Sequence, residues 1–394
     1  MPILKSLNKT KSNIFLFVNL TLVLESNRRR LIFAGGGRVP PPTAIYRPAI
    51  NRRPQGVANM FKSLIKDAGC LLAALTLFFA IPVGSASAAP LTLKLGHTAA
   101  PSQACAVSVR DMAKVVAEKT GGQVVIEVYE NSALGEEDEL LESSIMGTVD
   151  MFFGSGASLS GLVPEFMITD MPFPFGTPEE AYAFYDGEIG DLLFQKIETV
   201  GLVGLSYLEN GFRNMTNNVR AIHTPADMAG LKMRTMSSPV YMAMMKALGA
   251  SPTPIPYGEL YTALQQKTVD GQENPVTNIE SAKFYEVQKF ITLTRHSYDP
   301  NILLMSKKTR DKLTAEQFQI IKEAALAASR ESRLANNAAE EETLKMFEKA
   351  GLEVTRLNEA ERKQFVEATQ PIYAQFADKI GAEFFKKYMT ALGR

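Results

Sequence analysis

Stretches with the period of a β-strand alternate with stretches with the period of an α-helix, beginning at residue 91. Residues 91–97 alternate apolar and polar side chains, 123–129 are rich in β-branched residues, and 150–153 form a short apolar run. Residues 102–119 and 136–146 lie between them and carry apolar residues at helical spacing. This order predicts βαβ units and a mainly parallel sheet.

The same order of elements returns further along the chain. Residues 231–234 are expected to form a strand, 239–248 a helix that opens with a proline, 251–256 an extended segment and 257–267 another helix. A chain of 394 residues is also longer than one hydrophobic core usually serves. We therefore expect an α/β protein with two lobes of similar architecture.

Residues 314–350 contain neither glycine nor proline and are rich in helix-forming residues. Thr314 and Gln317 match a capping box at the start of this stretch. One uninterrupted helix would be ~55 Å long at 1.5 Å per residue. Such a helix is expected to brace both lobes, unless it breaks near Asn336 and Asn337. Residues 359–392 are again expected to be helical.

The amino-terminal part has the composition of a targeting segment. Residues 60–88 contain two lysines, an apolar run of about 14 residues and Ala86-Ser87-Ala88, which matches a signal-peptidase site after Ala88 or Ala89. A membrane anchor is the alternative, but the run is shorter than the ~20 residues that span a bilayer. Residues 1–59 are interpreted as a non-structural extension, with translation starting at Met60.

The overall balance of 42 basic and 42 acidic residues conceals an uneven distribution. Residues 1–88 hold 12 basic and two acidic residues, so residues 89–394 hold 30 and 40 and carry a net charge of −10. Such an acidic body has no general electrostatic attraction for nucleic acid. An anionic ligand would have to bind at a local basic site.

Sequence motifs for catalysis are absent. The three histidines are far apart and match no HExxH pattern, and the chain has no CxxC, P-loop, GxGxxG or GxSxG motif. Of the two cysteines, only Cys105 would remain after signal cleavage, and it is expected to be a small buried residue. We expect no metal, no cofactor and no enzymatic activity.

Residues 209–275 hold the most distinctive motifs, namely GFRN, GLKMR and DGQENP. With them the chain, from about Leu91 almost to its end, resembles the DctP-type solute-binding subunits of tripartite ATP-independent periplasmic (TRAP) transporters. The resemblance implies a two-lobed periplasmic-binding-protein-like fold with a ligand cleft between the lobes. We expect residues 89–211 and 300–335 in the first lobe, and 212–299 and 336–394 in the second.

The resemblance also implies which residues bind ligand. Arg234, the last residue of GLKMR, matches an arginine that forms a bidentate salt bridge with the ligand carboxylate, as a planar guanidinium can. Arg213 matches a second basic residue of the cleft, Asn274 an amide that contacts the ligand, and Tyr257 a packing position often held by phenylalanine. A lobe-stabilising ion pair for Arg234, a turn cap for Asn274 and simple packing for Tyr257 are the alternatives.

Three further residues belong to first-lobe loops that resemble ligand-contacting loops of the family. They are Glu137, Ser155 and Thr98. For Glu137 a charge at a helix start is the favoured alternative, and for Ser155 ordinary loop polarity is. Thr98, which follows the first strand, is open in the same way.

The function implied is capture of a small organic carboxylate by closure of the two lobes, for delivery to TRAP membrane subunits. A sugar acid such as a uronate is favoured, and a C4-dicarboxylate comes next. The protein is expected to be periplasmic and monomeric. A periplasmic enzyme acting on a sugar acid and a ligand-sensing subunit of a receptor are the rival hypotheses. The GLKMR and DGQENP pair argues against an ABC-type binding protein.

Overall fold

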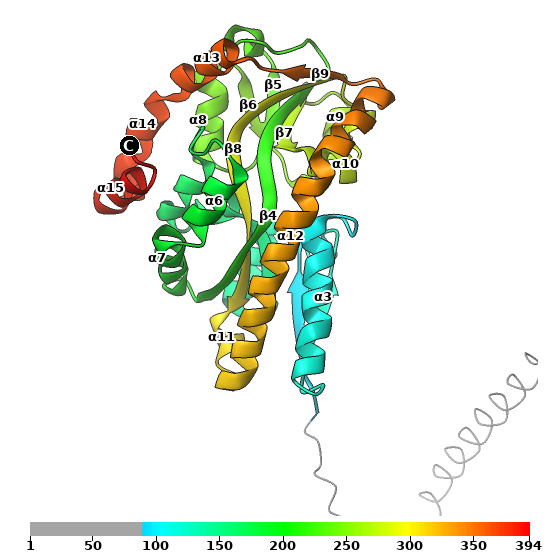
Figure 1. The fold of residues 1–394 in the computed structure, drawn as a ribbon, viewed down its shortest axis with the longest axis vertical. Helices are drawn as coiled ribbons and strands as arrows, with labels where there is room; N and C mark the ends of the chain where they lie inside the picture. The colour runs from blue at the N-terminus through cyan, green and yellow to red at the C-terminus, as the bar shows by residue number, and fades with distance from the viewer. Residues whose placement is uncertain (1–88) are drawn as a thin grey trace, which may run out of the picture. The chain divides into compact units, whose positions relative to one another are not determined.

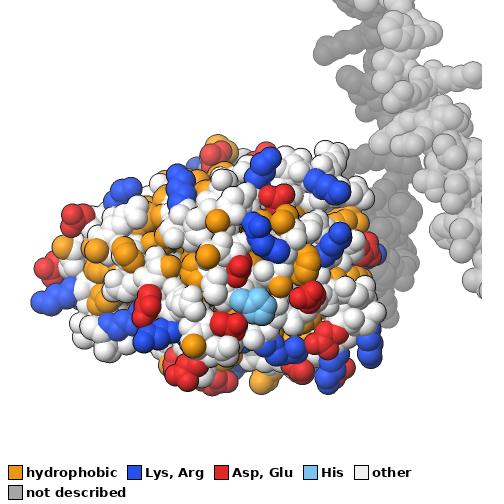
Figure 2. All heavy atoms as spheres, turned by 90° about the horizontal axis from the view of Figure 1, so that it is seen from above, with side chains coloured by type: hydrophobic (Ala, Val, Ile, Leu, Met, Phe, Trp, Pro, Cys, Tyr) orange, Lys and Arg blue, Asp and Glu red, His pale blue; other side chains and the backbone are white. Residues whose placement is uncertain are grey.

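The computed structural model describes residues 89–394 (Figure 1). The predicted extension 1–59 and signal peptide 60–88 lie outside these residues. Within 89–394, every helix is either too short or too polar to span a bilayer. Acidic and basic side chains are interspersed over the end of the molecule seen in Figure 2, where no large patch of one sign stands out.

One mixed β-sheet forms the centre of the fold. The strand order is β2-β1-β3-β8-β4-β7-β5-β6, and β9 pairs with β8. The outer strands pair in parallel, β1 with β2 and β3, and β5 with β6 and β7. The outer strands are β1 (Leu91–Gly96), β2 (Val124–Tyr129), β3 (Met151–Ser155), β5 (Lys232–Thr235), β6 (Ser251–Pro254) and β7 (Gly271–Pro275). The short strand that pairs with β8 is β9 (Glu353–Arg356).

The two longest strands were not predicted from the sequence. β4 (Leu202–Asn217) and β8 (Phe290–Ser306) run antiparallel to each other through the whole sheet and pair antiparallel with β7 and β3 respectively. Their register shifts between Glu209 and Gly211, where Gly211 has a φ of 118°. Such an angle favours glycine. The expected parallel βαβ units therefore form the two ends of a sheet whose middle is antiparallel.

The predicted helices are present within one to two residues of the expected ends. They are α3 (Ala104–Lys119), α4 (Glu137–Met146), α8 (Pro239–Ala247) and α9 (Tyr257–Gln265). A glycine in the left-handed conformation, Gly147, ends α4, and Ser238 caps the start of α8. The expected helical tail consists of three helices, α13 (Glu359–Thr369), α14 (Pro371–Ile380) and α15 (Ala382–Ala391).

The long helix is continuous. α12 (Ala315–Ala350) begins at the predicted capping box of Thr314 and Gln317 and ends at Gly351, without a break at Asn336 or Asn337. Its first half packs against α3 and its last turns pack near β9 (Figure 1). The prediction that this helix braces both lobes is confirmed.

Helices cover both faces of the sheet. On one face, α3 and the start of α12 enclose a core with β1, β2 and β3, and α9, α10 (Val276–Ser281) and the end of α12 enclose another. The opposite face carries a single larger core. Its elements are α4, α8, α14, α15, α5 (Gly156–Leu159), η1 (Pro164–Asp170), α6 (Pro178–Tyr185) and α7 (Glu188–Glu198).

The boundary expected between the lobes, at residues 211 and 299, coincides with the β4 and β8 pairing of Gly211 with Asp299. α14 and α15 pack against η1 and α7, which lie on the other side of that boundary in sequence. The remaining short elements are η2 (Pro225–Met228), η3 (Phe284–Glu286) and α11 (Lys307–Arg310). The domain division remains a prediction.

Candidate functional site

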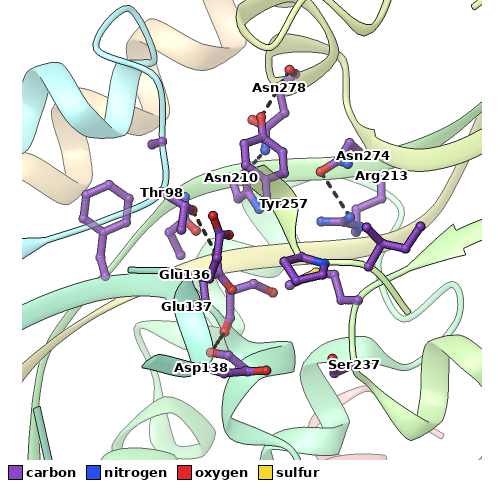
Figure 3. Close-up of a pocket in the computed structure, with 18 of the residues that line it drawn as sticks. Thr98, Glu136, Glu137, Asp138, Asn210, Arg213, Ser237, Tyr257, Asn274 and Asn278 are labelled. Atoms are coloured by element: carbon purple, nitrogen blue, oxygen red, sulfur yellow. Dashed lines mark hydrogen bonds between the residues drawn. The ribbon is translucent and has the colours of Figure 1, made fainter. Parts of the chain in front are cut away.

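A polar pocket lies where the strand ends of the two lobes face each other (Figure 3). Parallel strands present their carboxyl ends and the following loops to such a crevice. The empty volume is about 780 Å³, which includes the opening to solvent. All seven residues expected from the sequence line it, namely Thr98, Glu137, Ser155, Arg213, Arg234, Tyr257 and Asn274.

Arg234 is a buried cation with unused hydrogen-bond donors. It belongs to β5, and only 2% of its surface is exposed. Its Nε donates to the carbonyl oxygen of Ile255 at 2.7 Å. Within residues 89–394, neither Nη1 nor Nη2 has a hydrogen-bond or ion-pair acceptor. Burial lowers the pKa of Arg234 to about 10, although the nearby Glu273 opposes the shift. The negative charge of an anion in the pocket would offset the cost of burying the guanidinium.

Arg213 is also buried, but two carboxylates surround it. Its Nε donates to Glu273 Oε2 at 2.5 Å, and its Nη1 donates to Asp299 Oδ2 at 2.6 Å. Its Nη2 adds contacts to Glu273 and, at 3.2 Å, to Asn274 Oδ1. The guanidinium also lies over the ring of Tyr241. The charge of Arg213 is thus neutralised by the protein itself, in contrast to that of Arg234.

Glu273 and Asp299 anchor a buried network behind the pocket. Glu273 Oε2 lies 3.2 Å from His296 Nε2. Burial opposes the ionisation of Glu273, but Arg213 and His296 outweigh it and hold its pKa at about 2. Asp299 accepts hydrogen bonds from Ser155 Oγ and Asn210 Nδ2, both at 2.7 Å. These hydrogen bonds hold in place the strands that carry the pocket-lining side chains.

Asn274 and Tyr257 form the second-lobe side of the pocket. Asn274 is buried and donates to Gln272 Oε1 at 2.6 Å while its oxygen accepts from Arg213, which holds the amide in one orientation. Tyr257 opens α9 and packs edge-on against Phe284. Its hydroxyl donates weakly, at 3.5 Å, to the carbonyl oxygen of Asn278. The hydroxyl therefore remains available to a polar ligand.

Glu137 provides an acidic group on the first-lobe side. It lies at the start of α4, and the hydroxyl of Thr98 donates to its Oε1 at 3.4 Å. Burial, reinforced by Asp299, raises the pKa of Glu137 to about 8. The carboxyl group packs against Gly154, where a Cβ atom would come within 3.2 Å of it. A protonated carboxyl group can donate a hydrogen bond to a ligand oxygen.

Sequence reasoning missed eight polar residues that line the pocket, namely Gln103, Glu136, Asp138, Ser158, Asn210, Ser237, Asn278 and Asn301. Asn210 directly precedes GFRN, but the other seven belong to none of the motifs. Gln103 Nε2 donates to Asn278 Oδ1 at 2.7 Å, and Glu136 Oε2 accepts from the backbone of Gly258 at 3.2 Å. Both contacts join the two lobes directly across the pocket.

The three histidines lie in three different environments of the fold. His97 is buried and stacks on Phe153 with ring centroids 4.4 Å apart, His296 contacts Glu273, and His223 lies at the surface beside Glu361. In residues 89–394 no group of three or more His, Cys, Asp and Glu residues could hold a metal ion. Cys105 is a buried free thiol, as expected.

Comparison with known proteins places the chain in a family. Residues 95–379 match the model of bacterial extracellular solute-binding protein family 7, DctP. The chain is 34% identical, over 72% of its length and 86% of the relative, to the 2,3-diketo-L-gulonate-binding periplasmic protein YiaO of Escherichia coli. It is 36% identical, over 80% of its length and 95% of the relative, to the C4-dicarboxylate-binding periplasmic protein DctP of Rhodobacter capsulatus.

A solved structure agrees with this match. It is the sugar acid binding protein DctPAm of Advenella mimigardefordensis in complex with galactonate, with a TM-score of 0.75 and 36% identity over 77% of this chain and 98% of that one. The mixed sheet covered by helices on both faces fits the fold of that protein, as the TM-score indicates. The chain therefore belongs to the DctP family of solute-binding proteins, the binding subunits of TRAP transporters.

Proposed function

We propose that this protein binds a hydroxylated monocarboxylate, a sugar acid such as a uronate or an aldonate, and presents it to the membrane subunits of a TRAP transporter. The family binds small organic acids and acts in the periplasm. Export of this chain by cleavage of a signal peptide at 60–88 is part of the proposal. The observation that carries the ligand assignment is the unpaired guanidinium of Arg234.

Arg234 suits a carboxylate because its two terminal nitrogens point two donors in parallel. A carboxylate accepts such a pair in bidentate geometry, and lysine cannot reproduce it. Closure of the lobes excludes water, so the attraction between the two charges acts in a medium of lower dielectric constant. The lobes of the proposal are residues 89–211 with 300–335, and 212–299 with 336–394, closing as hinged domains do.

The charges of the pocket favour one carboxylate over two. Arg213 is already paired with Glu273 and Asp299, so Arg234 is the one unpaired cation among the described residues that line the pocket. The first-lobe side carries Glu136, Glu137 and Asp138. A second carboxylate would meet this acidic side, whereas hydroxyl groups could donate to it.

The relatives support this choice without deciding it. The galactonate complex and the relative named for 2,3-diketo-L-gulonate concern sugar acids, whereas another relative is named for C4-dicarboxylates. The polar side chains around Arg234, including Tyr257 and Ser155, supply donors and acceptors for several hydroxyl groups. We place sugar acids first and C4-dicarboxylates second.

Thermal unfolding in the presence of candidate acids tests the proposal. The panel contains galacturonate, galactonate, succinate and a neutral sugar, after removal of any ligand retained from expression. A ligand at 100 times its Kd stabilises the fold by ~2.7 kcal/mol. We expect a shift of Tm with a sugar acid that Arg234→Ala abolishes. Arg330→Ala, at an exposed position on α12, is the matched control.

Two results would contradict the proposal. One is an equal shift of Tm for Arg234→Ala and for the unchanged protein, which would show that the carboxylate binds away from Arg234. The other is stronger stabilisation by succinate than by any sugar acid. Mass spectrometry of the recovered ligand separates binding from catalysis, because a binding protein returns the acid chemically unchanged.

A further inference from the structure

Three carboxamides form a connected chain from one lobe to the other. Gln103 Nε2 donates to Asn278 Oδ1 at 2.7 Å, and Asn278 Nδ2 donates to Asn210 Oδ1 at 2.8 Å. Asn210 Nδ2 then donates to Asp299 Oδ2 at 2.7 Å. We call Gln103, Asn278 and Asn210 the amide chain. Figure 3 shows Asn278 directed towards Asn210.

The amide chain is buried and has a single direction. Its three side chains are 6–9% exposed, and Asp299 is fully buried. Every amide accepts through its oxygen and donates through its nitrogen to the next group, and the oxygen of Gln103 accepts from the backbone of Ala100 at 2.8 Å. Each amide oxygen is thereby occupied by the protein and not by a ligand.

The bond between Gln103 and Asn278 is the one in the amide chain that joins the lobes away from the strands connecting them. Gln103 precedes α3 in the first lobe, whereas Asn278 lies on α10 in the second. Asn210 and Asp299 lie at the bulge where β4 and β8 pass from one lobe to the other. Opening of the pocket would therefore break the bond between Gln103 and Asn278 and leave the rest of the chain intact.

Both partners of this bond are held in place before they meet. The backbone of Ala100 orients Gln103, and Asn210 orients Asn278. Side chains that are ordered in advance lose little conformational entropy when a contact forms. We propose that the hydrogen bond between Gln103 and Asn278 is a clasp that stabilises the closed state, so that it sets how fast any bound ligand leaves. Both are positioning residues that act through closure.

Rates of ligand binding test the clasp, a test that rests on the proposed function. Stopped-flow measurements with galacturonate and galactonate compare the unchanged protein with Gln103→Met, which keeps the length of the side chain and removes the bond. One hydrogen bond corresponds to a two- to tenfold effect, about 0.5–1.5 kcal/mol. We expect dissociation to accelerate by that factor, equally for every ligand, with an unchanged association rate. Gln195→Met, at an exposed position on α7, is the control.

A contact made directly with the ligand would behave differently. If Gln103 touched the ligand, Gln103→Met would change the ratio of the dissociation rates of the two acids, and that result would overturn the clasp. An unchanged dissociation rate would do so as well. In the double variant with Asn278→Leu, Gln103→Met should add no further acceleration, because the bond is already lost.

A measurement without ligand separates this inference from the proposed function. Spin labels at Lys119→Cys and Lys289→Cys, on the surface of the first and second lobes, report the distance between the lobes. We expect Gln103→Met to shift the distance distribution of the ligand-free protein towards the open form. Identical distributions would refute the clasp even if every acid bound, and a shift would support it even if none did.

Discussion

Arg213→Met should destabilise the fold strongly, although Arg213 lies in a ligand pocket. The arginine is 1% exposed, and its two carboxylate partners, Glu273 and Asp299, are completely buried. Removing one partner of a buried ion pair costs about 3–5 kcal/mol, because the remaining charge stays desolvated. Glu273 would keep His296 Nε2 at 3.2 Å and the charge of the nearby Arg234, with which it forms no direct ion pair. We therefore expect Arg213→Met to lower the free energy of unfolding by an amount in this range at pH 7.

The loss should depend on pH in a defined direction. With Arg213 present, the pKa of Glu273 is about 2, below its usual 4.5. The pair therefore adds stability above pH 4.5 that disappears as the pH falls towards 2. In Arg213→Met, burial is no longer opposed by the arginine, so the pKa of Glu273 rises and ionisation at neutral pH destabilises the fold. The difference between the two proteins should be largest at pH 7 and clearly smaller at pH 4.

Urea unfolding at pH 7 and pH 4, followed by far-ultraviolet circular dichroism, measures this difference. The chain has no tryptophan, so fluorescence offers a weaker signal. Arg330→Met is the control, because Arg330 is exposed and has no ion-pair partner within residues 89–394. A loss below about 1 kcal/mol, or an equal loss at both pH values, would refute the reasoning on the buried pair.

Gly190→Ala should lower the free energy of unfolding by about 1–3 kcal/mol in thermal unfolding, because the added Cβ would lie 1.7 Å from the carbonyl oxygen of Tyr185. Gly161→Ala should be tolerated, because nothing lies within 4 Å of its added Cβ. Burial raises the pKa of Cys105 to about 12, so a thiol reagent should modify the native protein far more slowly than the unfolded one; fast native labelling would contradict this. Thr314→Ala should destabilise by ~1 kcal/mol, and Thr314→Ser should not, because the hydroxyl caps α12; equal losses in urea would argue against the cap.

The elements that the sequence predicted correctly have strong local patterns. The strands and helices between residues 91 and 153 follow the alternation of periods, and α12 follows from the absence of glycine and proline together with the capping box at Thr314. Burial of Cys105 followed from its residue type. In each case neighbouring residues alone determine the outcome.

The elements that were missed depend on distant neighbours. β4 contains buried Glu209, Asn210, Arg213 and Asn214, a composition that does not indicate a central strand. These polar groups are tolerated because partners from other strands, such as Glu273 and Asp299, bond to them. Burial of polar residues in a strand cannot be predicted until those partners are placed.

The candidate site shows the same distinction. Motifs identified Arg234 as the arginine that binds the ligand carboxylate and Arg213 as a second basic residue of the cleft, but nothing in their local sequence shows which of the two the protein itself neutralises. Glu273 and Asp299 pair with one and leave the other free, although they lie 60 and 86 residues from Arg213. Likewise, Gln103 and Asn278 meet across 175 residues. Such pairings arise only from the folded chain.

The passage of β4, β8 and α12 through both lobes has a consequence for how the molecule unfolds. Neither lobe possesses a complete sheet or a complete helical cover without these three elements. Disordering one lobe would remove strands and a helix from the other, so the lobes cannot melt independently. Calorimetry of the ligand-free protein should therefore show one heat-absorption peak in place of two, and no fragment confined to a single lobe should fold by itself.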